Sequence, residues 1–122
     1  MKLRVRNNSL RIRLNRNEVA KLAQGKSLEE SVGFPGGSTF SYQLSVTADA
    51  LTTATFLNGT LTLAVPQHNV RDWSESDEIG LYYKLDAASP LDIAIEKDLE
   101  CLEGPADERD PDAFPRPAGK NC

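Results

Sequence analysis

The stretch from residue 10 to residue 34 recurs in this chain as a pattern of apolar positions. A shift of 51 residues places Leu10, Ile12 and Leu14 on Leu61, Leu63 and Val65 without a gap. The same shift matches Val19 with Val70, Leu22 with Trp73, Leu28 with Ile79, Val32 with Tyr83, and Phe34 with Leu85, and it places residues 7–9 on residues 58–60. Few positions are identical, so an internal repeat is indicated by pattern and element order rather than by shared residues.

Each copy is predicted to contain two strands, a short helix and two further strands. In the first copy, alternation of apolar and polar residues predicts a hairpin at 2–6 and 10–14. Asn15 and Glu18 then have the spacing of a helix capping box, and strands follow at 27–34 and 39–46. The second copy has strands at 53–57 and 61–65, a helix opened by Pro66, and strands at 79–85 and 90–96.

This order of elements predicts an α+β fold that is mainly β. Each four-stranded unit has one apolar face that it cannot bury alone, so two copies should pack together. We expect duplicated ββαββ units in an antiparallel barrel or in two half-barrels, with two short helices. The expected domain spans residues 1–103, with repeats at 1–50 and 51–101, and an acidic, proline-rich, extended tail follows at 104–122.

Composition places the chain among ordinary globular proteins. Its 122 residues are 39% apolar and 26% charged, enough for one domain with its own core. No apolar run approaches the roughly 18 residues of a membrane span, and no hydrophobic signal segment follows Met1. We therefore expect a cytoplasmic protein without membrane contact, in which Cys101 and Cys122 are free thiols.

Charge is distributed unevenly along the chain. Residues 1–26 hold eight Lys or Arg against Glu18 alone, whereas residues 96–112 hold eight Asp or Glu against Lys97 and Arg109. Such opposite ends predict either contact with each other or contact of each with a partner.

The first hairpin has a polar side that is entirely basic. It carries Lys2, Arg4, Arg6, Arg11 and Arg13, where the second copy has Thr53, Thr55, Leu57, Thr62 and Ala64. Like charges on paired strands repel, so something must compensate them. Two alternatives stay open. The protein's own carboxylates could do so, from Glu29, Asp92, Glu96 or the tail, or the five side chains could bind an anionic small molecule or an acidic protein surface.

Nucleic acid is a weaker match for this basic side. No aromatic residue precedes Phe34 to stack on bases, and the net charge of the chain is −4.

Two charged residues interrupt the apolar pattern. Glu30 stands where the second copy has Leu81, and Lys97 stands where the first copy has Val46. Buried charges require partners, so Glu30 and Lys97 are a candidate buried pair, either structural or part of a polar site. The alternative is that both lie at strand ends in water.

The sequence shows no established catalytic pattern. It has no Gly-rich phosphate loop, nucleophile elbow, His pair or Cys pair at metal spacing, and His68 is its only histidine. Cys101 follows Glu100, and an acidic neighbourhood raises a thiol pKa, so it is a poor nucleophile. The acidic run from 107 to 112 lacks the glycine and distal glutamate of a calcium loop. We therefore predict no catalytic residue, metal site or cofactor.

Three groups of residues resemble a small, uncharacterised bacterial family, a domain of unknown function. They are Trp73, Asp77, Ile79 and Gly80, then Ile95, Glu96, Lys97, Asp98, Cys101 and Leu102, and then Asp110, Asp112, Phe114, Pro115 and Pro117. The opening run from Asn8 to Leu14, with Glu18 and Val19, is similar to that family too. Arg116 departs from its pattern, which more often has Asn. The resemblance spans nearly the whole chain and implies no activity.

The basic hairpin and the run Glu96, Lys97, Asp98 also resemble, more distantly, triphosphate-tunnel enzymes. Those barrels need several inward carboxylates for metal, whereas the inward positions here are mainly Leu, Ile and Val.

Together these observations favour a non-enzymatic binding or interaction module. The alternative is an enzyme or binder for a phosphorylated small molecule or polyphosphate, with the basic residues holding oxygens and Glu30 or Glu96 supplying a metal ligand or base. Arginines that point into a cavity would favour the enzyme, and arginines on an outer face against carboxylates would disfavour it.

Overall fold

A computed structural model of the protein describes residues 1–99 and contains eight strands and two helices in that range. The first half holds β1 (Lys2–Arg6), β2 (Ser9–Leu14), α1 (Arg16–Ala23), β3 (Leu28–Gly33) and β4 (Thr39–Thr47). The second half holds β5 (Thr53–Leu57), β6 (Thr60–Pro66), α2 (Gln67–Ser74), β7 (Gly80–Leu85) and β8 (Leu91–Lys97). The predicted α+β, mainly β fold class is confirmed, and the elements follow the predicted order, ββαββ in each half.

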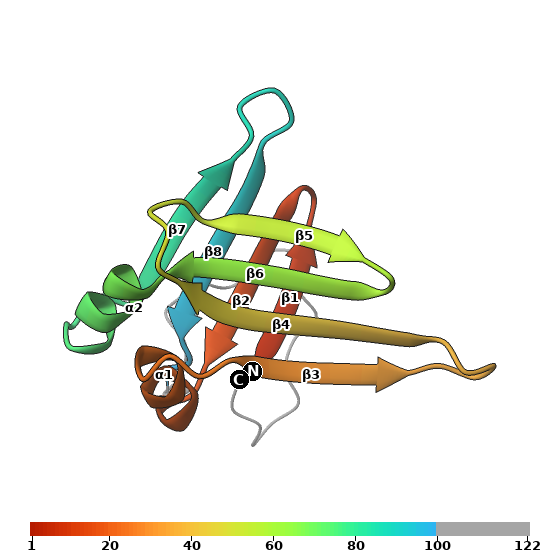
Figure 1. Cartoon of the computed structure of the whole chain (residues 1–122), viewed down its shortest axis with the longest axis horizontal. Coiled ribbons are helices and arrows are strands. Elements are labelled where there is room, and N and C mark those ends of the chain that lie inside the picture. Colours follow the sequence, from red (N-terminus) through yellow and green to blue (C-terminus); the bar gives the residue numbers. More distant parts are fainter. Residues whose placement is uncertain (100–122) are drawn as a thin grey trace, which may run out of the picture.

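The strands form two four-stranded sheets, and each sheet takes one hairpin from each half of the chain. Sheet A has the order β1-β2-β8-β7, and sheet B has the order β3-β4-β6-β5. In Figure 1 the strands of the two sheets cross, and both helices lie at one end of the molecule. Among residues 1–99 no strand pairing joins the sheets, so they are two sheets rather than one closed barrel.

The pairing differs from an all-antiparallel arrangement at the centre of each sheet. Every hairpin is antiparallel, but β2 pairs with β8 in parallel, and β4 pairs with β6 in parallel. Neither ββαββ unit therefore forms a four-stranded sheet by itself, which corrects the expectation that each copy is a four-stranded unit packed on the other. The first hairpin of each unit joins the other unit's second hairpin, because the intervening helix carries the chain from one sheet to the other.

The pairing registers of the two sheets repeat with the 51-residue shift. Lys2 faces Arg13 in β1–β2, and Thr53 faces Ala64 in β5–β6, so both partners move by 51. The parallel pairs obey the same relation, since Ser9 faces Asp92 and Thr60 faces Ser41. These are the registers that a duplicated unit predicts.

The third strand of each unit departs from that shift by two residues. Leu28 faces Leu44 and Leu81 faces Ile95, so Leu28 corresponds to Leu81 rather than to Ile79 as the sequence pattern predicted. Glu30 consequently corresponds to Tyr83 rather than to Leu81. The cause is a longer connection after the second helix, which moves β7 along by two residues and keeps the same face inward.

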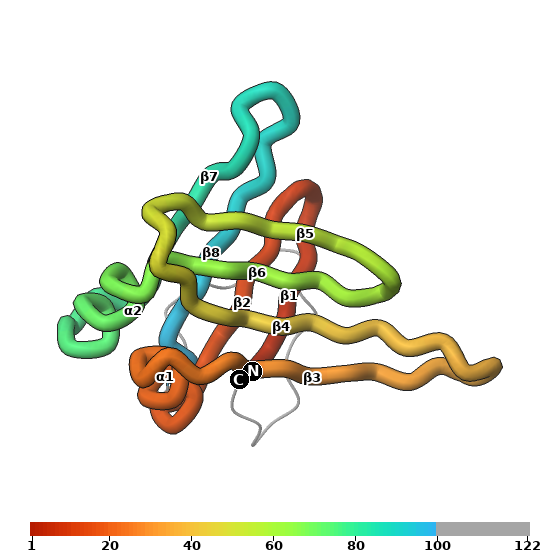
Figure 2. Tube along the Cα trace, viewed as in Figure 1, coloured from red at the N-terminus to blue at the C-terminus, as the bar shows by residue number. Residues whose placement is uncertain are grey.

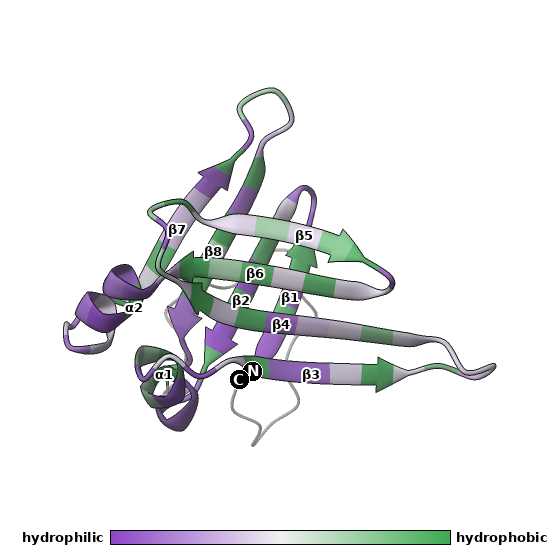
Figure 3. Cartoon of the chain, viewed as in Figure 1, coloured by the Kyte–Doolittle hydropathy of each residue, from purple (hydrophilic) through white to green (hydrophobic). Residues whose placement is uncertain are grey.

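The two halves contribute equally to the core. Its twelve buried residues are Ile12, Leu14, Val19, Leu22, Leu28 and Leu44 from the first half, with Leu63, Val65, Val70, Trp73, Ile93 and Ile95 from the second. Ten of the twelve form five pairs related by the 51-residue shift. Figure 3 shows hydrophobic and hydrophilic residues alternating along the strands, so each strand turns one face to this core and one face outward.

The hairpin turns project from the body of the molecule, and Figure 2 shows the β3–β4 and β7–β8 turns as its two longest extensions. Among residues 1–99 no helix has the length and apolar character needed to cross a membrane. The predicted tail at 104–122, with Cys101 and the acidic run at 107–112, lies outside the described residues.

Candidate functional site

The five predicted basic residues lie together on the outer face of sheet A. Strand alternation turns Ile12 and Leu14 of β2 into the core and therefore turns Arg11 and Arg13 outward. The β1–β2 register then fixes the neighbours on this face: Lys2 faces Arg13, and Arg4 faces Arg11. The structure thus brings the whole predicted set onto one surface.

Cross-strand pairing extends this surface over β8 and β7 in three rows. They are Lys2, Arg13, Glu96 and Gly80, then Arg4, Arg11, Ala94 and Tyr82, and then Arg6, Ser9, Asp92 and Lys84. The rows hold six cationic side chains and two carboxylates, a formal charge of +4. Sheet A therefore has a strongly basic outer face although the chain has a net charge of −4.

Glu96 is the main carboxylate on this face. Its Oε1 lies 3.1 Å from Nε of Arg11 and 3.8 Å from Nε of Arg13, and the Tyr82 hydroxyl donates to its Oε2 at 2.8 Å. The Glu96 side chain is only 13% exposed. These contacts draw Arg11, Arg13 and Tyr82 toward one end of the face.

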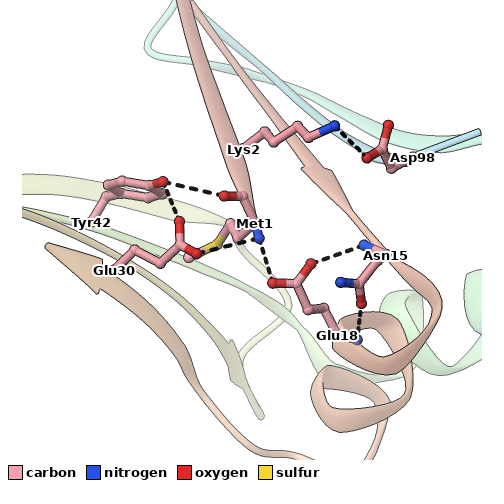
Figure 4. A network of polar contacts seen from close by, with 7 residues as sticks. All are labelled: Met1, Lys2, Asn15, Glu18, Glu30, Tyr42 and Asp98. Carbon is pink, nitrogen blue, oxygen red and sulfur yellow. Dashed lines mark hydrogen bonds and ion pairs between the residues drawn. The ribbon is translucent and has the colours of Figure 1, made fainter.

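Two more ion pairs involve the edge strands. Lys2 Nζ lies 2.8 Å from Oδ2 of Asp98 (Figure 4). The backbone N–H of Asp98 also donates to Leu14 O. On the opposite edge, Lys84 Nζ lies 3.9 Å from Asp92. The protein's own carboxylates therefore compensate part of the basic face, as one sequence alternative predicted, but Glu29 does not contribute, because it lies on β3 of sheet B.

Arg4 and Arg6 have no carboxylate within 4.0 Å among residues 1–99. They flank a pocket of about 450 Å³ on the outer face of sheet A, which is also lined by Arg11, Tyr82, Lys84 and Asp92. Ala94 lies among these longer side chains, and its methyl group leaves room between the Arg residues and Tyr82. Four cationic side chains thus surround a pocket that contains one carboxylate.

The glycine at position 80 allows Tyr82 to lie in its observed orientation. A Cβ at Gly80 would lie 2.7 Å from the Tyr82 hydroxyl oxygen and 2.9 Å from Cγ of Glu96. The Tyr82 side chain therefore leans along β7 over Gly80, where its hydroxyl meets Glu96. That hydrogen bond, with burial and the Glu96 charge, raises the pKa of Tyr82 above its ordinary value of 10.0.

Sheet B shows that the fold itself does not require this charge. The residues that correspond to Arg4, Arg6 and Arg11 are Thr55, Leu57 and Thr62, and those that correspond to Ala94, Tyr82 and Lys84 are Gln43, Glu29 and Ser31. The same backbone pairing therefore forms with a nearly neutral outer face. The cations of sheet A are a property of that sheet alone.

The predicted Glu30–Lys97 pair is not formed. The Glu30 carboxylate accepts from the Tyr42 hydroxyl and lies 3.5 Å from the Met1 ammonium, whereas Lys97 Nζ donates to Ser76 O at 2.6 Å. Lys97 also lies over the Trp73 ring, 5.6 Å from its centroid. Glu30 is 45% exposed, and no charged residue is buried in the described part of the chain. The two-residue offset of β3 relative to β7 explains why the sequence comparison misplaced Glu30.

The Met1 ammonium lies between two carboxylates from different elements. Figure 4 shows it between Glu18 of α1 and Glu30 of β3, at 2.5 Å and 3.5 Å from their oxygens, and the Met1 side chain is 1% exposed. Burial alone lowers the pKa of this amine, but the hydrogen bond and charge of Glu18, with the charge of Glu30, outweigh it, and the net pKa is raised. Glu18 also completes the predicted capping box with Asn15.

Sequence reasoning missed the β7 and β8 side of the pocket, namely Tyr82, Lys84 and Ala94. Alternation along β7 places Tyr82 and Lys84 on one side, but only the parallel β2–β8 pairing shows that this side adjoins Arg11. No group of three or more metal-ligating side chains occurs among residues 1–99, and the predicted absence of a cofactor is not tested by this structure.

The fold and the site define a small α+β domain in which two equivalent sheets pack on one core and one of them carries a cationic outer pocket. Within that class, the chain belongs to DUF7009, a family of unknown function whose model matches residues 1–118. This match confirms the resemblance to an uncharacterised family. No curated protein and no solved structure matches the chain.

Proposed function

We propose that this protein is a binding module that holds an anionic ligand, such as a phosphate group, on the outer face of sheet A. The observation that carries the proposal is the contrast between the two sheets. Arg4, Arg6 and Arg11 surround a pocket on sheet A, whereas sheet B has hydroxyl and aliphatic side chains at the same register positions. A charge excess that the fold does not require is typical of a surface selected for a charged partner.

The chemistry of the pocket suits oxyanions. Guanidinium groups donate in a planar fork that matches phosphate and carboxylate oxygens, and charge-assisted hydrogen bonds are the stronger ones. Arg4 and Arg6 alternate on β1 with one residue between them, so their Cα atoms lie about 7 Å apart along the edge strand. Two neighbouring guanidinium groups can hold one multivalent anion. Their position at the surface, together with the predicted cytoplasmic location, favours a ligand that arrives from solvent.

The alternative of an enzyme acting on a phosphorylated small molecule has less support. It required Glu30 or Glu96 to supply a metal ligand or a base beside the arginines. Glu30 lies on β3 of sheet B and contacts Met1 and Tyr42, and Glu96 contacts two arginines and Tyr82. Arg11 also lies on an outer face against Glu96, the arrangement that disfavours the enzyme, whereas Arg4 and Arg6 line the open pocket that the binding proposal uses.

Isothermal titration calorimetry with inorganic pyrophosphate tests the proposal. The wild-type chain should bind, and the double variant Arg4→Gln/Arg6→Gln should bind at least about tenfold more weakly, because each lost charge-assisted hydrogen bond is worth about 1.5–3 kcal/mol. Lys26→Gln is the matched control, since Lys26 is exposed, cationic and outside the pocket. Absence of pyrophosphate binding, or an equal loss in Lys26→Gln, would refute specific anion binding at sheet A.

A further inference from the structure

The pocket on sheet A joins its cations to an exposed aromatic ring. Tyr82 is 62% exposed and lines the pocket together with Arg4, Arg6 and Arg11. The Tyr82 ring lies outside the core of the protein, because its neighbours on β7, Leu81 and Tyr83, are the residues that pack against the core. The corresponding residue on sheet B is Glu29, so the fold does not require an aromatic residue there.

The Tyr82 ring is held in place. Its hydroxyl donates to Glu96 at 2.8 Å, and its side chain lies over Gly80, where any larger residue would collide with it. Fixing an exposed ring lowers the entropy that binding must later remove. The Tyr82 hydroxyl is neutral at physiological pH, because even the ordinary tyrosine pKa of about 10 keeps it protonated, so the side chain does not repel an anion.

The cationic end and the aromatic end of the pocket lie on opposite sides of Ala94. At the β7 edge, Asp92 lies 3.9 Å from Lys84 and offsets its charge. At the β1 edge, no carboxylate of residues 1–99 lies within 4.0 Å of Arg4 or Arg6. The row from Arg4 through Arg11 and Ala94 to Tyr82 crosses three strand spacings, or about 14 Å.

From this arrangement we propose that the ligand is a phosphate ester of a flat ring compound, of the nucleoside diphosphate class. Its phosphates lie at Arg4, Arg6 and Arg11, its linking group crosses Ala94, and its ring stacks on Tyr82. The proposal rests on the proposed function and adds the aromatic half of the ligand. A pocket of about 450 Å³ is within the usual size range for such a molecule.

Three probes separate the two halves of the ligand: adenosine diphosphate, inorganic pyrophosphate and adenosine. The wild-type chain should bind adenosine diphosphate about tenfold more tightly than pyrophosphate, as expected from the stacking of one base on an aromatic side chain. Tyr82→Leu should reduce the affinity for adenosine diphosphate to that for pyrophosphate. Tyr82→Phe, which keeps the ring, should retain most of the difference.

These outcomes separate the proposal of a ring-containing phosphate ester from the broader proposal of anion binding at sheet A. Equal affinity of the wild-type chain for pyrophosphate and adenosine diphosphate would overturn the ring proposal and leave anion binding intact. Binding of none of the phosphate probes would overturn both. Should Tyr82→Leu not fold, the comparison of the probes on the wild-type chain decides alone, with chemical shift changes at Tyr82 expected for adenosine diphosphate and not for pyrophosphate.

Discussion

Ala94 of β8 and Gln43 of β4 occupy the same register position in two equivalent sheets, yet the first adjoins a cationic pocket and the second does not. Ala94 lies between Arg11 and Tyr82, and Gln43 lies between Thr62 and Glu29. The fold accepts either residue at this position, so packing does not require an alanine there. The smaller side chain on sheet A leaves the pocket open.

Ala94→Gln should therefore close the pocket at little cost in stability. We expect the affinity for adenosine diphosphate to fall by about tenfold, because the longer side chain takes the space between the arginines and Tyr82 and so prevents the ring from stacking. The midpoint of urea unfolding should change little, since outward substitutions are usually within about 0.5 kcal/mol. Calorimetry and urea unfolding measure the two effects, and Gln43→Ala on sheet B is the control that should alter neither. Unchanged affinity for adenosine diphosphate in Ala94→Gln would show that the ligand does not cross Ala94 to reach Tyr82.

Glu96→Gln should lower the pKa of Tyr82 toward 10. The Glu96 hydrogen bond is the main cause of the raised pKa, with burial and the Glu96 charge adding to it, and the amide removes the charge. Ultraviolet titration of tyrosinate absorbance measures this change.

Tyr42 provides the comparison within the same molecule. Burial, with the hydrogen bond and charge of Glu30, raises the pKa of Tyr42 to about 12. Glu96→Gln should leave that titration in place, whereas Glu30→Gln should lower it and leave Tyr82 unchanged. If Glu96→Gln left every tyrosine titration where it was, the Tyr82–Glu96 contact would be refuted.

Stability should decrease above pH 8 because of the Met1 ammonium. Its folded pKa is raised above the ordinary value of 8.0, so its contribution is complete below pH 8 and disappears as pH rises through the folded pKa. Glu18→Gln keeps a capping acceptor for Asn15 but removes the charge opposite Met1. We expect it to lower the free energy of unfolding at pH 7 by at most about 1 kcal/mol, as for a partly exposed ion pair.

Urea unfolding between pH 7 and pH 10 measures this contribution as the difference between wild type and Glu18→Gln. The difference should shrink as pH rises. Glu29→Gln, which removes an exposed carboxylate from sheet B, should run parallel to wild type over the same range. A Glu18→Gln difference that stayed constant with pH would contradict the role given to the ammonium.

Gly59→Ala should destabilise the protein by about 1–3 kcal/mol. Gly59 has a φ of +76°, and an added Cβ would lie 2.7 Å from the backbone oxygen of Thr39, at the place where Ser41 N donates to Gly59 O. The new methyl group would push the β5–β6 turn away from β4. Gly33→Ala is the matched control, because a Cβ added there would have no atom within 4 Å and the φ of Gly33 is not positive. Thermal denaturation of both variants measures the difference, and similar melting points would contradict the close contact.

Local pattern was sufficient to predict the elements but not how they combine. Alternation, the Asn15 capping box and the 51-residue shift are properties of neighbouring residues, and the hairpins and helices follow them closely. The parallel pairing of β2 with β8 joins residues more than 80 positions apart, and no local pattern encodes it. The two-residue displacement of β7 was missed because a shift of two preserves the alternation that revealed the repeat.

In the site, too, local pattern predicted some of the residues, and nonlocal strand pairing determined the others. The basic half of the pocket lies on one hairpin, and the residues from Lys2 to Arg13 could be grouped from alternation alone. Tyr82 and Ala94 belong to the other half of the chain, and their proximity to Arg11 depends on the nonlocal pairing. The Glu30–Lys97 pair failed for a related reason, since it assumed that the third strands followed the 51-residue shift.

The most direct test of anion binding at sheet A is a titration of the ¹⁵N-labelled chain with pyrophosphate, followed by amide chemical shifts. The two sheets serve as test and control in one sample, because each backbone position on one has a counterpart on the other. We expect saturable shifts at Arg4, Arg11 and Ala94 and none at their counterparts Thr55, Thr62 and Gln43. Equal shifts on both sheets, or none on either, would contradict anion binding at sheet A.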